Sequence, residues 1–280
     1  MPEQDESPAA LRDEERAEVE NRGAPRPIVV YEVIRHEGEH ELDRSASALA
    51  FSGLAAGLSM GFSFVAQGLV RALLPDEPWQ ALVSSLGYSI GFLIVILGRQ
   101  QLFTENTLTP ILPLLRNPSW ARAGRVARLW AIVLATNLLG TVGFALILAH
   151  TAVVHSIDDS ALAAIGRDAV AGSVATLFVR AIFAGWLIAL MVWLLPGAAT
   201  SRAAVVVIIT YLIGLAGFAH VIAGSVDVCY VAALGDVSWL HVVVRWFVPV
   251  LLGNLVGGLL LVTALNHAQV TSGEAVGDET

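Results

Sequence analysis

A long apolar part of the sequence is interrupted by Gly217-Phe-Ala-His-Val-Ile-Ala-Gly-Ser-Val-Asp227, which places an imidazole and a carboxylate seven residues apart. Ionisable side chains are costly inside a membrane and are rare there unless they serve a function. The meaning of His220 and Asp227 therefore depends on whether the segments around them cross a membrane, and on what else interrupts those segments.

The composition indicates a polytopic membrane protein. Hydrophobic residues make up 56% of the 280 residues and charged residues only 14%, which is unlike a soluble domain. The net charge of −8 lies at the ends, since residues 1–44 contribute −7 and residues 266–280 contribute −3, whereas the body contributes +2. We therefore expect no nucleic-acid partner. The single cysteine, Cys229, excludes an intrachain disulfide.

The amino-terminal residues 1–44 predict an acidic tail. Residues 1–27 are rich in Glu, Asp, Arg and Pro, which predicts disorder, and their acidity argues against a cleavable secretory signal. Residues 28–42 place apolar side chains at 28, 29, 30, 33 and 34 among charged ones. This pattern predicts a short amphipathic helix that lies at the membrane surface or packs under the bundle.

The predicted amphipathic helix contains His36-Glu-Gly-Glu-His40, which matches the H-E-x-x-H pattern of zinc proteases. Two histidines at i and i+4 share one helical face beside a glutamate base. Gly38 weakens such a helix, however, and no third ligand follows nearby. We favour a solvated run of charges, and we expect no metal, no cofactor and no enzymatic activity, since the membrane body offers no nucleophile with a base either.

The remaining apolar segments predict an all-α polytopic membrane protein. Full spans are expected at residues 45–74, 79–98, 126–149, 170–195, 203–220 and 239–265. The second and fifth spans are each followed by a polar interruption and a short apolar piece, at 108–115 and 226–234. If each broken pair forms one helix with an irregular middle, six transmembrane helices make a channel domain over residues 45–265, followed by a tail at 266–280.

The placement of arginine predicts the orientation of the bundle. Loop 116–128 holds four Arg and no acid, and the loop around Arg202 holds one more. The opposite loops, 73–78, 151–169 and 235–238, carry six acids against Arg167 alone. Because cytoplasmic loops are enriched in basic residues, we expect both tails on the cytoplasmic side.

Short motifs recur in the same order in two halves of the chain: Tyr88-x-Ile-Gly91 with Tyr211-x-Ile-Gly214, Ala56-Gly57 with Ala184-Gly185, and Asn137-Leu-Leu-Gly140 with Asn254-Leu-Val-Gly257. Counting sixteen residues on from each tyrosine pairs Thr104 with Asp227. Halves of three spans each run in opposite directions across the membrane. The pattern therefore predicts a 3+3 inverted repeat with two broken helices at corresponding positions, which is typical of a substrate pathway.

The two breaks are expected to line one pathway, because irregular backbone at membrane depth needs protein or a water-filled cavity to satisfy its polar groups. They carry Thr104, Glu105, Asn106, His220, Ser225 and Asp227. For His220 we favour a pore role over a structural hydrogen bond between helices. Asp227 either lines a mouth or caps the short helix that follows. Asn137 and Asn254 either bind helices together or, for Asn254, face the pore.

Four motifs resemble the formate/nitrite transporter family over residues 45–265: Leu102-Phe-Thr104, Gly217-Phe-x-His220, Leu177-x-x-Arg180 and Gly253-Asn-Leu-Val-Gly-Gly258. The first break looks most like the divergent YfdC-type branch. The resemblance implies an aquaporin-like protomer and a homopentamer in a bacterial inner membrane. It also implies a central His220 that is hydrogen-bonded to Thr104. Leu102 matches a constriction residue, and Gln101, Phe103 and Asn254 complete the pore-lining set.

Several positions depart from the family pattern. Gln101 stands where Glu is typical, Gly185 and Gly224 stand where Asn is usual, and no Lys precedes the fourth span. Glu105 and Asp227 replace small or neutral residues. Extra carboxylates and missing cationic and amide groups weaken the attraction of anions. The resemblance therefore predicts the fold better than it predicts the substrate.

The leading hypothesis is a membrane channel for a small monovalent anion, similar to formate or nitrite, or for its conjugate acid. A bare anion is costly to desolvate in an apolar constriction. His220 would lower that cost by donating a hydrogen bond or by passing a proton. The alternatives are a pore for water or small neutral solutes, which the extra carboxylates favour, and a membrane scaffold or sensor with no transport role.

Overall fold

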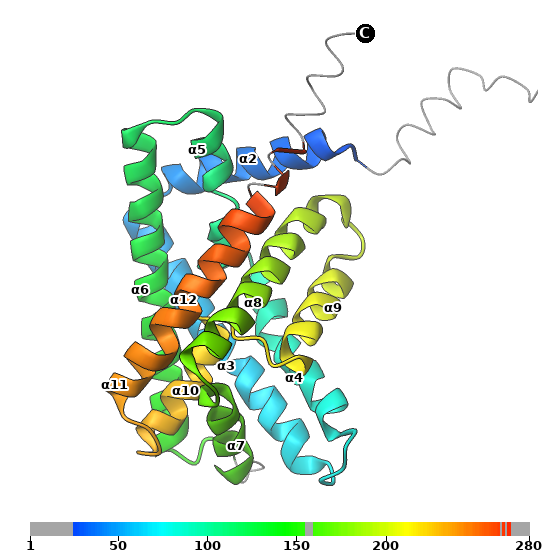
Figure 1. Ribbon diagram of the computed structural model, residues 1–280, viewed down its shortest axis with the longest axis vertical. Coiled ribbons are helices and arrows are strands. Elements are labelled where there is room, and N and C mark those ends of the chain that lie inside the picture. Colours follow the sequence, from blue (N-terminus) through cyan, green and yellow to red (C-terminus); the bar gives the residue numbers. More distant parts are fainter. Residues whose placement is uncertain (1–24, 155–158, 264, 267, 270–280) are drawn as a thin grey trace, which may run out of the picture.

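The computed structural model describes residues 25–154, 159–263, 265, 266, 268 and 269. The predicted disorder of residues 1–24 and most of the tail at 266–280 lie outside the described residues. Within the described part, helices connected by short turns account for the fold (Figure 1). Their bounds are α2 (Pro27–Asp43), α3 (Ala46–Leu73), α4 (Gln80–Leu97), η1 (Glu105–Thr107), α5 (Ile111–Arg116), α6 (Trp120–His150), α7 (Asp159–Val170), α8 (Val174–Leu194), η2 (Leu195–Gly197), α9 (Arg202–Leu215), α10 (Ala223–Ala233), α11 (Trp239–His241), η3 (Val242–Phe247), α12 (Val248–Leu255) and η4 (Val256–Thr263).

Six transmembrane elements form the bundle, as predicted. Five helical stretches are long and apolar enough to cross a membrane: Ala46–Leu73, Gln80–Leu97, Trp120–His150, Val174–Gly197 and Trp239–Leu259. The sixth is the pair α9 and α10, which have 14 and 11 residues and are separated by residues 216–222. We call residues 98–110, between α4 and α5, the first break and residues 216–222 the second break.

Helix α2 confirms the predicted amphipathic helix and packs against one end of the bundle. It lies across the end of the molecule that carries α5 (Figure 1), and it buries Tyr31 and Ile34. Gly38 is a packing requirement rather than a weakness, because a Cβ there would collide with the backbone oxygen of Thr109. His36 and His40 place their Nε2 atoms 3.1 Å apart. No group of three metal-ligating side chains occurs among the described residues.

Helix α7 was missed by the sequence analysis, which predicted a loop at 151–169 and a span from residue 170. The acids around it suggested a loop, yet α7 is a helix at residues Asp159–Val170 and the next span begins only at Val174. Leu162, Ala163 and Ile165 of α7 are buried in the main core. The buried apolar residues lie on one face of an amphipathic helix, which packs against α10 and α3.

Two asparagines hold the breaks in the same way and reveal the inverted repeat. Asn137 Nδ2 donates to the backbone oxygens of Gly53 and Gln101, at 2.8 and 2.9 Å, and its Oδ1 accepts from Phe103 N at 2.9 Å. Asn254 repeats this arrangement in the other half. Its Nδ2 donates to the backbone oxygens of Ala181 and Ala219, at 2.8 and 2.9 Å, and its Oδ1 accepts from Val221 N at 2.8 Å.

Glycine contacts extend the same correspondence to the helices. A Cβ on Gly57 would meet the backbone oxygen of Asn137, and a Cβ on Gly185 would meet that of Asn254. At the ends of the bundle, Gly38 of α2 faces the Thr109 oxygen and Gly166 of α7 faces the Asp227 oxygen. Each repeat therefore consists of a surface helix, a long helix, a broken helix and a further long helix.

The correspondence corrects one predicted match. Because residues 101 and 103 match residues 219 and 221, Thr104 corresponds to Ile222, and Asp227 corresponds to Thr109 rather than to Thr104. The two Tyr-x-Ile-Gly motifs misled the count, since Gly91 lies well inside α4 whereas Gly214 lies at the end of the shorter α9.

Candidate functional site

The first break turns the chain into the middle of the bundle. Arg99 adopts a φ of 50° directly after α4, and Gln100 N donates to Val95 O at 2.9 Å. Residues 101–104 follow in a buried, non-helical stretch whose backbone is held by Asn137. The Phe103 ring packs edge-on against Trp130, with centroids 5.9 Å apart. This stretch delivers the Thr104 side chain to the centre.

The second break delivers His220 to the same point. Gly217 has a φ of +63°, a conformation that glycine adopts readily, and Asn254 holds the backbone on both sides of His220. The imidazole is 1% exposed, and its Nε2 lies 2.7 Å from Thr104 Oγ1. Phe92 of α4 meets the ring edge-on, with centroids 5.1 Å apart.

The hydrogen bonds of His220 define its tautomer. Ala223 N donates to Nδ1 at 3.1 Å, so Nδ1 is an acceptor and carries no hydrogen. A neutral imidazole then has its hydrogen on Nε2 and donates to Thr104 Oγ1. The hydroxyl hydrogen of Thr104 is consequently directed away from the ring and is available to a passing solute.

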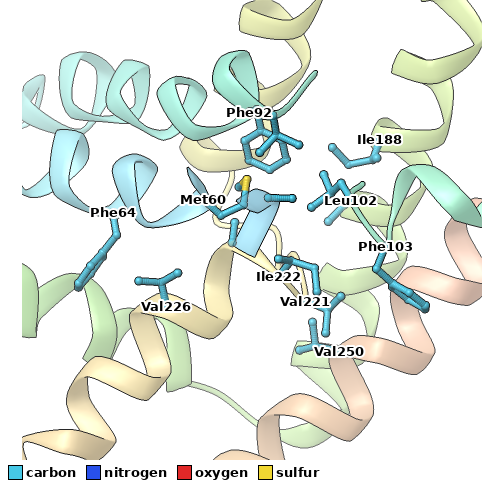
Figure 2. Packing of buried hydrophobic residues seen from close by; sticks show 14 of the residues in the cluster. Met60, Phe64, Phe92, Leu102, Phe103, Ile188, Val221, Ile222, Val226 and Val250 are labelled. Atoms are coloured by element: carbon cyan, nitrogen blue, oxygen red, sulfur yellow. The ribbon is translucent and has the colours of Figure 1, made fainter. Parts of the chain in front are cut away.

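Two cavities approach this pair from opposite ends of the bundle. The Asp227 cavity, of about 540 Å³, lies on the α7 side and includes His220 in its lining. The Glu105 cavity, of about 140 Å³, lies on the α2 side and includes Leu102. Between them, Leu102, Phe92 and Ile188 are fully buried and point toward one another (Figure 2). An apolar collar therefore separates two polar cavities.

The predicted site residues divide into two groups. Five of them line a cavity: Gln101, Leu102 and Glu105 on one side, and Asp227 with His220 on the other. Thr104 lies between the cavities as the partner of His220. Asp227 is the fifth residue of α10, whose N-cap is Ile222, so the capping alternative is wrong.

Phe103 and Asn254 line neither cavity among the described residues. Both polar side-chain atoms of Asn254 bind backbone groups, which supports the alternative that this residue binds helices together. Gln101 has a structural task as well, since its Nε2 donates to Glu41 Oε2 at 2.8 Å and its Oε1 accepts from Asn106 Nδ2 at 3.0 Å.

Sequence reasoning gave no role to two residues of the site. Arg180 appeared only as part of a motif, yet it lines the Asp227 cavity from α8. An arginine within an apolar span is a functional signal in its own right, and its spacing from Leu177 and Ala184 places all three on one helical face. Phe92 carries no comparable signal, because a phenylalanine in an apolar span is unremarkable in sequence.

A buried imidazole between two cavities, at the meeting point of two broken helices in an inverted repeat, defines a membrane channel or transporter. The chain belongs to the formate/nitrite transporter family. The family model described as "Formate/nitrite transporter" matches residues 29–268, which confirms the resemblance seen in the sequence.

Curated relatives support the same family. The chain is 39% identical over 251 residues to "Inner membrane protein YfdC" of Escherichia coli (strain K12), a match that covers 90% of this chain and 81% of the relative. It is 24% identical over 239 residues to "Formate channel BtFdhC" of Bacillus thuringiensis, covering 83% and 91% of the two chains.

A solved structure shares the fold. The structure "Pentameric formate channel with formate bound" superposes with a TM-score of 0.69 and 22% sequence identity, and the match covers 81% of this chain and 98% of that chain. The shared fold makes this chain an all-helical membrane protein with an aquaporin-like arrangement of helices.

Proposed function

We propose that this protein is a channel for a small monovalent anion or its conjugate acid, and that solute crosses at the His220–Thr104 pair. The observation that carries the proposal is the position of this hydrogen-bonded pair beside an apolar collar, with a cavity on either side. The formate channel among the relatives supports formate as a first solute to test.

In this proposal the two side chains have separate tasks. His220 donates from Nε2 to Thr104 Oγ1, and this bond fixes the rotamer of the threonine. When the solute crosses as the anion, the threonine hydroxyl donates to it after it has left its hydration shell. A hydrogen bond to a charged group is worth about 1.5–3 kcal/mol, which offsets part of the desolvation cost in the collar.

We extend the proposal to assembly and orientation. The protein acts as a homopentamer with a pore in each protomer, by analogy with the pentameric formate channel of the same fold. Residues 45–265 form the channel body in a bacterial inner membrane, as in the relative YfdC, and both termini face the cytoplasm. The orientation rests on six arginines near the α2 end of the bundle, at positions 99, 116, 122, 125, 128 and 202.

Uptake into proteoliposomes tests the proposal. The purified full chain is reconstituted, and uptake of formate, nitrite, lactate and hydrosulfide is measured at two pH values against protein-free vesicles. His220→Phe removes the donor to Thr104 and is expected to lower uptake about tenfold or more, the equivalent of about 1.4 kcal/mol. His241→Phe, at an exposed histidine, is the matched control. Unchanged uptake in His220→Phe would sink the proposal.

A pore for small neutral solutes is the second candidate. One observation favours it: each cavity contains a carboxylate without an ion pair among the described residues, Glu105 on one side and Asp227 on the other. When ionised, such groups repel anions and leave neutral solutes unaffected. Osmotic swelling in glycerol or urea that exceeds anion uptake would favour this function over the first.

A further inference from the structure

The Asp227 cavity contains two groups that the proposed pathway does not yet use. Asp227 and Arg180 both line it together with His220, from α10 and α8. A substrate anion that crosses the collar as the neutral acid must first acquire a proton from a group in this cavity or from the solution.

His220 is poorly suited to supply that proton. Its Nδ1 already accepts a hydrogen bond from Ala223 N, and its Nε2 is bonded to Thr104. A second proton on the ring would sit on Nδ1 and face the N–H of Ala223, so two donors would oppose each other. The backbone of α10 thus holds the imidazole in its neutral form.

Asp227 is placed for the task. Its side chain is 8% exposed and lines the cavity, and no other described residue forms a hydrogen bond or an ion pair with its carboxyl group. A carboxyl group donates one hydrogen bond when protonated and only accepts when ionised. We propose that Asp227, rather than His220, passes the proton to the substrate anion in this cavity.

Among the described residues that line the Asp227 cavity, one cationic side chain is available to bind the substrate anion. The charged or titratable side chains that line the same cavity are Arg71 of α3, Tyr88 of α4, Asp168 of α7, Arg180 of α8 and His220 of the second break. The other titratable residues of α10 are Cys229 and Tyr230, and the lining residue from η3 is Trp246. Arg71 is paired with Asp168 at 3.2 Å. Arg180 has no ion pair among the described residues, so its guanidinium is available to hold an anion.

The proton balance of the step is simple. The substrate anion binds at Arg180, the O–H bond of the Asp227 carboxyl group breaks, and an O–H bond forms on the substrate. The neutral acid then crosses the collar past Thr104. The Asp227 carboxylate recovers a proton from hydronium in the solution that fills the cavity. Each crossing moves one anion and one proton together.

This inference rests on the proposed function, and the experiment separates the two. The full chain is reconstituted in vesicles that contain a pH-sensitive dye, and formate uptake and internal acidification are recorded together. Asp227→Asn keeps the shape and removes the proton. We expect it to lower proton-coupled formate uptake about 100-fold, the lower end of the range for a positioned general acid. Asp227→Glu is expected to restore most of it, and Asp76→Asn, at an exposed carboxylate, is the control.

The outcomes are distinct. If the wild-type protein carries none of the weak acids, the proposed function and the inference both fail. If the wild-type protein carries formate and Asp227→Asn carries it with equal proton coupling, the inference alone is overturned. Should the variant not assemble, the wild-type protein is treated with dicyclohexylcarbodiimide, which attacks protonated carboxyl groups. Labelling of Asp227 that formate slows, located by mass spectrometry, supports the inference, and an unlabelled Asp227 overturns it.

Discussion

The two breaks share a backbone arrangement and differ in the side chain that each presents. Asn137 holds the backbone on both sides of Leu102, and Asn254 holds the backbone on both sides of His220, with closely matching distances. Leu102 lines one cavity and His220 lines the other. The inverted repeat supplies a symmetric frame, and the chemistry of the pathway comes from unlike residues at matched positions.

The same contrast extends along the half-helices. Glu105 corresponds to Ala223, and Asp227 corresponds to Thr109. Each cavity therefore has one carboxylate without an ion pair among the described residues, at a position where the other repeat has no carboxylate. The two mouths therefore differ in chemistry although their backbones match. Substitutions at matched positions distinguish the part of the molecule that is symmetric from the part that is not.

The largest expected effect comes from the two asparagines. Asn137→Ala leaves Gln101 O and Phe103 N without this partner, and Asn254→Ala does the same to Ala219 O and Val221 N, at about 1–3 kcal/mol for each group. Both variants are expected to lose several kcal/mol and to lower the melting temperature in detergent by similar amounts. Asn117→Ala, at an exposed asparagine, is the control. A large loss in one variant and a small loss in the other would break the equivalence of the repeats.

Matched glycines give the next largest effect. Gly57→Ala and Gly185→Ala each push a methyl group into the backbone oxygen of the asparagine that holds a break. Overpacking of this kind costs about 1–3 kcal/mol. Gly143→Ala, where no atom lies within 4 Å of the added Cβ, is expected to leave stability unchanged or slightly raised. Melting curves of the three variants measure this, and a neutral result at Gly57 or Gly185 would contradict the close helix approach.

The sequence predicted much of this frame because membrane helices and close packing leave strong signals. Apolar length located the spans, and the small residues and asparagines of the third and sixth spans located the repeat. The sequence did not predict helix α7, because a short apolar run flanked by acids suits a loop and an amphipathic surface helix equally well. The pairing of Thr104 with Asp227 was wrong. A count of residues along the chain does not show that the Tyr-x-Ile-Gly motif lies well inside α4 but at the end of the shorter α9.

The site itself was only partly predictable. The cost of burying His220, Glu105 and Asp227 singled out these residues without any structure. The bond from Ala223 N to His220 Nδ1, which decides how the ring behaves, depends on the turn that starts α10 and leaves no trace in the sequence. For the same reason, the choice between a pore role and a structural role for Asn254 could be made only once its hydrogen-bond partners were known.

A smaller effect is expected from the carboxylate of the Glu105 cavity. In this cavity Glu37 is paired with Arg99 and Glu41 with Arg44, so Glu105 is the carboxylate without an ion pair among the described residues. At a pH at which the Glu105 carboxyl group is ionised, Glu105→Gln removes one repulsive charge. It is expected to raise formate flux about two- to tenfold at low ionic strength, with a smaller gain at high salt. Urea flux in the same vesicles should not change, and an equal rise for urea would indicate a widened pore instead.

The smallest effect concerns the residue that follows the first half of each broken helix. Arg99 and Gly217 occupy matched positions, with φ values of 50° and 63°, and no atom lies within 4 Å of a Cβ added to Gly217. Gly217→Ala is therefore a purely conformational change and is expected to cost about 1 kcal/mol. Arg99→Gly relieves the same strain but breaks the exposed ion pair with Glu37, worth about 0–1 kcal/mol, so a net change below about 1 kcal/mol is expected. Arg99→Ala keeps the strain and loses the pair, which separates the two contributions in melting curves. If Gly217→Ala melts like the wild-type protein, the left-handed turn is not a shared requirement of the two breaks, and Arg99 tolerates its conformation for reasons confined to the first repeat.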